Sequence, residues 1–324
     1  MIAGAAKAAE AIIREQKPDG SIGPDVSYSY KALWPLALAG RVEEAAKLLE
    51  WYTARFLRPN GEFRCEDAPY APNQVNWRFL YPNAWLTIGA AHLERLEISY
   101  RVGAFIEGCQ SENGGFPAAR DLVDGDVPQD MLSACMCGLV LLYQGKLEKA
   151  LRAGKFLIDL HEAQPDPENH IYLNLSPSGR LLTNYPAERA YMYVINKKLP
   201  EQPYFAPGAA MAFLSKLFMI SGKKEYLAYA ERYYRLALSL QSDIPLGLFD
   251  YPTSGKIGWG AGNLYRATGK QVYRQVAERV GRYLLKTQLE DGRWPKFRDN
   301  SDTNLAAEFC AWLLEMAKAL TASV

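Results

Sequence analysis

Histidine and cysteine are scarce in this sequence of 324 residues, which contains three His and five Cys. The Cys count is odd and no CxxC pair occurs, which fits reduced thiols better than a disulfide framework. Zinc in proteins is held mainly by Cys and His, and Cys65 and His92 are the only ligands that we can suggest. We therefore expect neither a metal nor a cofactor.

An excess of charge of one sign is also missing. Thirty-seven Lys and Arg stand against 36 Asp and Glu, a net charge of +1, which argues against nucleic acid or an anionic membrane surface as a partner. No apolar stretch approaches the ~20 residues of a membrane span. The first residues read as an amphipathic helix instead of a signal peptide, so we expect a cytoplasmic protein. The sequence lacks the phosphate-binding motif GxxxxGK[ST], the dinucleotide-binding motif GxGxxG before a helix, and the hydrolase nucleophile motif GxSxG.

A repeated phrase is what the sequence does contain. A helix ends in an aromatic and an aliphatic residue, and a Gln, a Gly-containing turn and another aromatic residue follow. The clearest copy has Gln288, Gly292 and Trp294, and an earlier one has Gln110 and Gly114 before Phe116. The weaker copies are Gln16 with Gly20, Asn60 with Gly61 and Phe63, Gln241 with Gly247 and Phe249, and one with His161 in the Gln position.

The repeat divides the chain into six pairs of helices. A half-solvated outer set is expected over 3–16, 42–57, 95–109, 146–162, 223–240 and 270–287. A more apolar inner set is expected over 27–40, 75–93, 128–144, 205–221, 254–268 and 303–320. Short turns at Gly40, Gly145, Gly222 and Gly269 join inner to outer helices, and the longer connections must all emerge at the other end. We therefore predict one all-α domain over 1–324, an α/α toroid of six helical hairpins with an inner and an outer ring, and a lid-like insertion at about 163–204.

The phrase around Gln288 and Trp294 resembles the QW motif of the terpenoid cyclases. The chain looks like the α/α toroid superfamily that includes these cyclases and the protein prenyltransferase β subunits. The resemblance implies a fold and a central binding cavity, because the Gln and aromatic residues of that motif tie helix ends together. The Asp-x-Asp-Asp motif of squalene-hopene cyclases is absent, and its nearest match is Asp124-Gly125-Asp126. The six-hairpin sugar enzymes resemble the chain in architecture only.

Three carboxylates are candidate catalytic residues. Asp126 and Asp130 precede the third inner helix, where crowded carboxylates raise one another's pKa, although Asp126 would serve equally well as the cap of that helix. Glu308 lies in the most apolar predicted helix, and a buried Glu is rare unless it is paired or functional. It is either a general acid or base that faces the cavity or a partnered structural ion.

Candidate substrate-binding residues come from the inner helices and the long connections. Each also has a purely structural interpretation. Glu188 and Arg189 in the predicted lid could be solvated ions, and Asp250 and Tyr251 could be turn residues. The aromatic residues could belong to the core. The aromatic candidates are Trp77, Tyr81 and Trp259.

The leading functional hypothesis is an enzyme that binds a small terpenoid-like or polycyclic substrate in the cavity and catalyses acid–base cyclisation or isomerisation. The alternative is a carbohydrate-active enzyme, which would be a glycoside hydrolase, a lyase or an epimerase. A toroid that only binds a ligand, without catalysis, is the third possibility. The preponderance of 20 Tyr over 12 Phe favours a polar substrate, because Tyr adds a hydroxyl group to its apolar ring.

Overall fold

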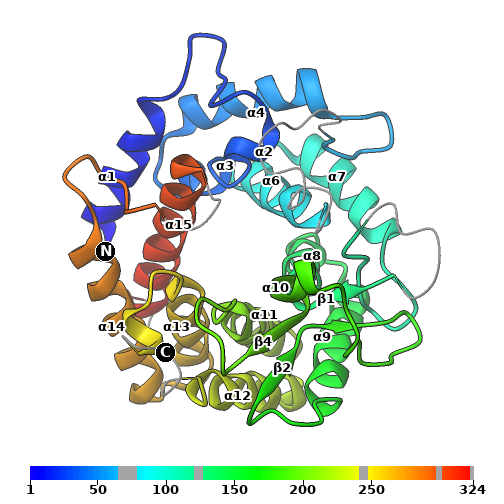
Figure 1. The fold of residues 1–324 in the computed structure, drawn as a ribbon. Helices are drawn as coiled ribbons and strands as arrows, with labels where there is room; N and C mark the ends of the chain where they lie inside the picture. Colours follow the sequence, from blue (N-terminus) through cyan, green and yellow to red (C-terminus); the bar gives the residue numbers. More distant parts are fainter. Residues whose placement is uncertain (65–78, 120–126, 241–246, 297–300, 322–324) are drawn as a thin grey trace.

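The computed structural model describes residues 1–64, 79–119, 127–240, 247–296 and 301–321, and it forms a closed ring of helices in two layers (Figure 1). This confirms the predicted α/α toroid. The outer helices are α1 (Ile2–Ile13), α4 (Val42–Phe56), α7 (Leu96–Gly108), α9 (Leu147–Glu162), α12 (Lys224–Leu238) and α14 (Gln271–Thr287). The inner helices are α2 (Val26–Ser29) with α3 (Leu33–Leu38), α6 (Leu80–His92), α8 (Met131–Tyr143), α11 (Ala206–Ser221), α13 (Gly255–Thr268) and α15 (Asp302–Thr321).

The two layers differ in burial as their composition predicts. In α8 every residue from Met131 to Leu142 is buried, whereas α9 buries one apolar face and leaves its charged residues outside. No helix of the described ranges is long and apolar enough to cross a membrane. The four short turns predicted at glycines all have those glycines at φ of 70° to 75°, as a left-handed helix cap requires. We call this end of the ring the turn end and the opposite one, where the longer connections lie, the loop end.

Glutamine side chains join neighbouring outer helices. Each amide nitrogen donates to the Gly carbonyl of its own turn at 3.0 to 3.1 Å and to a carbonyl of the next outer helix at 2.8 to 2.9 Å. The pairs are Gln16 with Glu44, Gln110 with Lys149, and Gln288 with Gly4. The last pair links α14 to α1 and so closes the ring.

His161 stands at the Gln position of the fourth repeat, but its Nδ1 has no hydrogen-bond partner among the described residues. The amide of Gln164, three residues further on, donates to Leu160 O at 2.8 Å and Tyr172 O at 3.0 Å. Its second acceptor lies in a strand of the following connection and not in the next outer helix. The His161 ring instead packs edge-on against Tyr229 and Tyr233.

The first inner helix is broken, where a continuous helix over 27–40 was expected. Pro35 has no N–H group to donate and its ring clashes with the carbonyl of the residue four positions earlier, which is Lys31. The α-helical hydrogen-bond pattern is accordingly interrupted between α2 and α3, at residues 30–32, although Tyr30 and Ala32 keep helical dihedral angles. Lys31 therefore lies in a short break that faces the ring interior.

The connection over 163–204 carries short strands, which the all-helical prediction did not include. β2 (His170–Tyr172) pairs antiparallel with β4 (Val194–Asn196), and β3 (Asn174–Leu175) pairs with β1 (Gln129–Asp130). Ile171 and Ile195 face each other in the first pair and are fully buried. Since β1 occupies residues 129–130, α8 begins at Met131 and not near Pro128. That this connection opens and closes as a lid stays a prediction.

The close approach of each Gly turn to the next outer helix gives a stability prediction. A Cβ on Gly292, at φ +92°, would lie 2.3 Å from the Lys7 carbonyl oxygen, whereas one on Gly145, at φ +73°, would meet no atom within 4 Å. We expect Gly145→Ala to cost about 1 kcal/mol for its left-handed backbone alone. Gly292→Ala should cost about 2 kcal/mol more, because α14 and α1 must separate. Urea unfolding of both variants measures the difference, and equal losses would contradict this account of ring closure.

Candidate active site

Four tryptophans from four inner helices meet in the middle of the ring. Trp259 stacks on Trp312 with 4.5 Å between ring centroids, and Trp34 packs edge-on against Trp85 at 4.9 Å and against Trp312 at 5.8 Å. All four side chains are fully buried. We call this group the tryptophan belt. A separate group of buried charges lies on each side of it along the ring axis.

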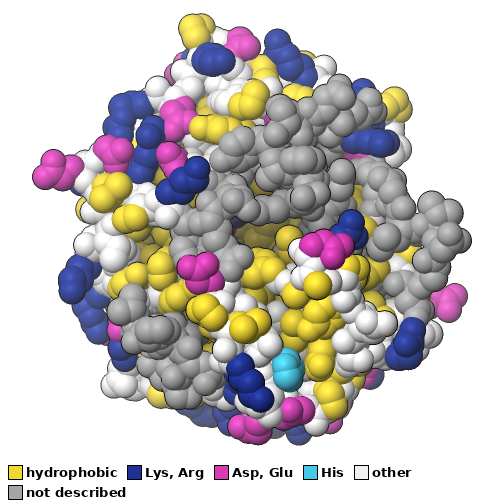
Figure 2. Space-filling view, in the orientation of Figure 1, with side chains coloured by type: hydrophobic (Ala, Val, Ile, Leu, Met, Phe, Trp, Pro, Cys, Tyr) yellow, Lys and Arg dark blue, Asp and Glu magenta, His cyan; other side chains and the backbone are white. Residues whose placement is uncertain are grey.

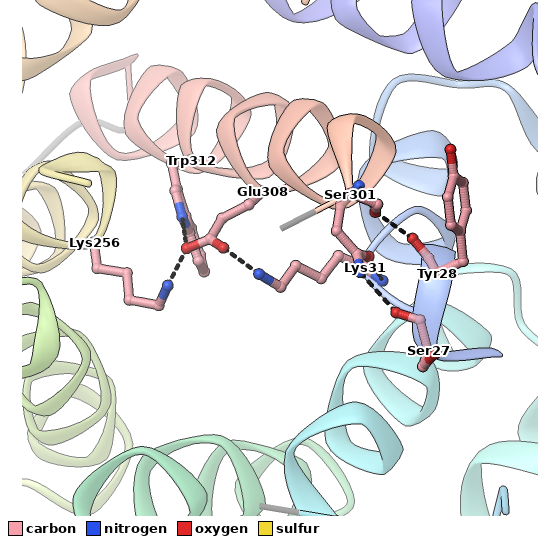
Figure 3. Close-up of polar contacts among 8 residues, drawn as sticks. Ser27, Tyr28, Lys31, Lys256, Ser301, Glu308 and Trp312 are labelled. Carbon is pink, nitrogen blue, oxygen red and sulfur yellow. Dashed lines mark hydrogen bonds and ion pairs between the residues drawn. The ribbon is translucent and has the colours of Figure 1, made fainter. Parts of the chain in front are cut away.

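The charged group on the loop side is a carboxylate shared by two lysines. Both oxygens of Glu308 are ion-paired, Oε2 with Lys31 and Oε1 with Lys256, and the Trp312 indole nitrogen donates to Oε1 at 3.3 Å. The side chains come from α15, from the break before α3 and from α13, and they point toward one another across the space that the inner helices enclose (Figure 3). The lysine side chains are 6% and 4% exposed and that of Glu308 is 12% exposed, so the carboxylate is the member most open to solvent.

The electrostatics of this group are set by competition between burial and pairing. Burial alone opposes ionisation of Glu308, but the positive charges of Lys256 and Lys31 outweigh it and lower the pKa of Glu308 to about 2. For Lys31 burial also opposes the charge, and Glu308 prevails and raises its pKa. At neutral pH Glu308 is therefore an anion, and it is not available as a proton donor.

Local structure explains how the two lysines reach Glu308. Lys31 lies in the break that Pro35 imposes on the first inner helix. Lys256 is the second residue of α13, so its side chain starts at the loop end of that helix. Its ammonium group lies 4.6 Å from the Phe205 ring centroid and 5.4 Å from that of Trp312, both within cation–π range.

The charged group on the turn side joins Lys216 and Glu315. Lys216 Nζ lies 3.3 Å from Glu315 Oε2 and 3.1 Å from the Tyr143 hydroxyl, and the Trp259 indole nitrogen donates to the same carboxylate oxygen at 3.1 Å. Burial opposes the charge on Glu315, but Lys216 and then Lys318 lower its pKa. With Glu315 4% and Lys216 9% exposed, this pair is a buried structural contact between α11 and α15.

The structure places two of the three predicted catalytic residues. Glu308 lies at the centre of the loop-side group. Asp130 is fully buried as the N-cap of α8, where its Oδ1 accepts from the backbone of Leu132 at 3.0 Å and Ser133 at 3.2 Å. The cap of this helix is therefore Asp130 and not Asp126, which lies outside the described residues.

The predicted substrate-binding residues are scattered. Trp77 lies outside the described residues, and Trp259 belongs to the belt, where its indole nitrogen serves the turn-side group. Tyr81 is buried edge-on to Tyr30, with 6.2 Å between the centroids. Direct contact of any of them with a substrate stays a prediction.

Of the candidates from the connections, Tyr251 is buried, Asp250 is half-buried, and Glu188 and Arg189 lie at the surface. Asp250 pairs with Arg279 of α14, and Tyr251 packs edge-on against Tyr204 at 5.3 Å. Glu188 and Arg189 are exposed in η1 (Ala187–Arg189), just before α10 (Ala190–Tyr193), which lies beside the ring opening in Figure 1. Figure 2 shows this end of the ring, where hydrophobic side chains gather toward the middle and charged ones mostly toward the rim.

Sequence reasoning missed Lys31 and Lys256. Both stand among apolar and small residues, in SYKALWP and SGKIGWG, and this setting is the one signal that could have identified them. A buried Glu needs a cationic partner, so a search for lysines in apolar surroundings on other inner helices would have been the logical complement to the prediction of Glu308.

Other features of the described chain do not form a second site of this kind. A cavity of about 470 Å³ lies in the outer wall between α9 and α12, but Glu162 and Arg232 pair across it and no predicted site residue lines it. No group of three or more His, Cys, Asp or Glu in the described ranges could hold a metal ion. Cys135, Cys137 and Cys310 are buried free thiols.

The depressed pKa of Glu308 predicts a pH dependence of stability. Because the folded pKa of about 2 lies below the ordinary 4.5, the contribution of Glu308 is complete above pH 4.5 and is lost as the pH falls toward 2. Glu308→Gln should destabilise the protein at neutral pH, since two buried lysines lose their counter-charge. Its free energy of unfolding should then fall less steeply than that of the wild type between pH 4.5 and 2. Parallel curves from chemical unfolding at several pH values would show that Glu308 is not the group responsible.

No family model matches the sequence, and no curated protein matches it. Solved structures do match over nearly the whole chain. A D-mannose isomerase is 13% identical with a TM-score of 0.70, covering 98% of this chain and 96% of its own. A GH76 α-mannanase from Bacteroides thetaiotaomicron is 11% identical with a TM-score of 0.66, covering 99% of this chain and 97% of its own. A type II terpene cyclase from Scytonema is 12% identical with a TM-score of 0.58, covering 98% and 97%. At these identities the likeness shows the fold, which is the six-hairpin α/α toroid.

Proposed function

We propose that this protein is a carbohydrate-active enzyme that isomerises or epimerises a small sugar at the loop end of the ring. The observation that carries the proposal is the carboxylate of Glu308, shared by Lys31 and Lys256 above the tryptophan belt. Such a group combines a proton acceptor with two cationic hydrogen-bond donors, and both are needed to move a proton next to a carbonyl group. Among the structural neighbours are a D-mannose isomerase and a sugar epimerase from a ruminal bacterium.

Terpenoid cyclisation, the leading hypothesis from sequence, has less support. A cyclase that starts by protonating an alkene needs a strong acid in its protonated form, and a carboxyl group with a pKa of about 2 is ionised at neutral pH. Stabilisation of a carbocation also needs accessible aromatic faces. The four indoles of the belt are fully buried against one another.

Glycoside hydrolysis is also less well supported by the described residues. It uses two carboxyl groups about 5 to 10 Å apart across an open cleft. In the part of the chain that the structure describes, Glu308 is the one carboxylate in the loop-side group, and Asp130 is engaged as a helix cap. An α-1,6-mannanase among the neighbours is inactive when two consecutive aspartates are replaced, and this sequence contains no two consecutive Asp.

The proposed reaction uses the coupling between the lysines and Glu308. When one lysine turns from Glu308 to the carbonyl oxygen of an open-chain sugar, it polarises that carbonyl and withdraws its charge from the carboxylate. The pKa of Glu308 then rises toward its ordinary value, so Glu308 can accept the proton from C2. The lysine stabilises the negative oxygen of the enediolate that forms.

Return of the proton decides the product. Delivery from Glu308 to C1, with transfer of the hydroxyl proton from O2 to O1, converts an aldose to a ketose. Epimerisation needs a proton on the opposite face of C2 from a second donor, for which the ammonium group of the other lysine is the candidate, while Glu308 keeps the proton that it removed. Glu308 is thus a weak base while both lysines contact it, and it becomes an effective base only when a substrate binds.

Deuterium exchange tests the proposal. Purified protein is incubated with D-mannose, D-glucose or D-fructose in D₂O, and proton NMR follows exchange at C1 and C2. We expect exchange together with conversion between sugars. Glu308→Gln should slow it at least about 100-fold, because it removes the proton acceptor. Lys256→Met should slow it too, whereas Glu231→Gln, a control on the outer wall, should retain it.

Three results would contradict the proposal. Absence of exchange with all three sugars would refute the isomerase. Full activity of Glu308→Gln would show that the reaction occurs elsewhere. Hydrolysis of α-1,6-mannotriose without exchange, or cyclisation of a geranylgeranyl substrate, would assign the chain to one of the other reactions that its structural neighbours represent.

A further inference from the structure

The two oxygens of Glu308 are held differently. Oε1 accepts a hydrogen bond from the Trp312 indole nitrogen at 3.3 Å and is also ion-paired with Lys256. Oε2 is ion-paired with Lys31, which is its one partner among the described residues. Figure 3 shows Lys31 approaching the carboxylate from the side opposite to Lys256. Departure of Lys31 would therefore free a whole oxygen atom, whereas departure of Lys256 would leave Oε1 bonded to the indole.

The turn-side group provides an internal comparison. One oxygen of Glu315, Oε2, also accepts from an indole, that of Trp259, at 3.1 Å and also pairs with a lysine, Lys216, at 3.3 Å. An indole and a lysine on one oxygen are thus enough to bury a carboxylate on α15. The loop-side group contains the same arrangement and adds Lys31 on the second oxygen. The addition is made at the more accessible carboxylate, since the Glu308 side chain is 12% exposed and that of Glu315 is 4% exposed.

The two lysines also differ in their aromatic surroundings. The Lys256 ammonium group lies 4.6 Å from the ring centroid of Phe205 and 5.4 Å from that of Trp312. The Lys31 ammonium group lies 5.6 Å from the ring centroid of Tyr30. Cation–π attraction weakens with distance and adds up over rings, so it holds Lys256 more firmly than Lys31. Lys31 is therefore the lysine that leaves the carboxylate more readily.

We infer that Lys31 is the lysine that turns to the substrate carbonyl, and that it thereby frees Oε2 of Glu308 to act as the base. Lys256 and Trp312 stay on Oε1 and hold the carboxylate in position. With an aldose, the C2–H bond breaks, its proton bonds to Oε2, and its electron pair forms the C1–C2 double bond. The carbonyl electrons move to O1, whose negative charge Lys31 stabilises. This division of roles rests on the proposed function.

A movement of the Lys31 side chain is sufficient for this step. The backbone N–H of Lys31 donates to Asn304 Oδ1 at 3.3 Å, and the Asn304 amide nitrogen donates to Ser27 O at 2.9 Å. The break in the first inner helix is thus fastened to α15, which also carries Glu308. The flexible four-carbon stem of lysine lets the ammonium group move while the backbone stays in place.

The pH dependence of kcat, measured with a sugar on which the wild type shows exchange, tests the inference. Its acid limb reports the pKa of the base in the enzyme–substrate complex, where Lys31 has already left Glu308. Lys31→Met should therefore keep the limb in place and lower kcat about 100-fold, because the carbonyl loses its cation. Lys256→Met should move the limb at least about one unit to higher pH, because removal of a nearby positive charge raises the pKa of a carboxyl group.

Two further variants complete the comparison. Trp312→Phe, which removes the indole donor from Oε1, should move the acid limb in the same direction as Lys256→Met but less far. Lys216→Met is the matched control, because it removes a buried lysine from the turn-side group. It should lower the stability of the fold and leave both kcat and the acid limb unchanged.

Circular dichroism verifies that each variant is folded at every pH of the assay. If a methionine variant does not fold, Lys31→Gln and Lys256→Gln give the same comparison, because the amide keeps a hydrogen-bond donor and loses the charge. A limb that moves with Lys31 and not with Lys256 would reverse the two roles and overturn the inference, and equal shifts would overturn it too. A wild type without exchange on any sugar would refute the proposed function and this inference together, whereas an active wild type with either of these patterns would refute the inference alone.

Discussion

Closure of the ring is the constraint on which the rest of the structure depends. A hairpin of two helices cannot bury both of its apolar sides alone, and six of them succeed only if the last meets the first. The Gln288 amide, bonded to Gly292 in its own turn and to Gly4 of α1, makes that junction. A hydrogen bond of this type contributes only about 1 kcal/mol net. Its larger effect is geometric. It sets the distance between successive outer helices, and so keeps the inner helices arranged around the ring axis.

The arrangement of the inner helices explains why the charges inside the ring are ion-paired. Six apolar helices around one axis create a surrounding of low polarity, in which an isolated ion is costly. Glu308 and Glu315 lie on opposite sides of the tryptophan belt, each ion-paired with lysine and each accepting a hydrogen bond from an indole of the belt. Apolar residues of similar volume often give equal or greater stability than a buried ion pair. The retention of two lysines around one partly accessible carboxylate is therefore the best argument that the loop-side group does more than stabilise the fold.

The sequence predicted most of the fold because its signals are local. Helical periodicity, glycines at turns and a repeated glutamine each operate within a few residues, and they located the six outer helices and five of the six inner ones to within a few residues. The break at Lys31 was missed although Pro35 signalled it, because the apolar pattern continues across the break. The short strands were missed because two or three paired residues leave no periodicity.

The candidate site was only partly predictable, because its parts are far apart in the chain. Glu308 attracted attention as an acid in an apolar helix. Its partners are separated from it by 277 and 52 residues, and nothing in one sequence pairs them. The roles of the tryptophans were equally hidden, since composition cannot distinguish indoles that pack against one another from indoles that face a ligand.

The belt also limits the side from which a molecule could reach Glu308. Its four indoles have no exposed surface and pack against one another between the loop-side and the turn-side charges. A molecule that binds at Glu308 would therefore arrive from the loop side and depart on the same side, so a product would have to clear the site before the next substrate could take its place.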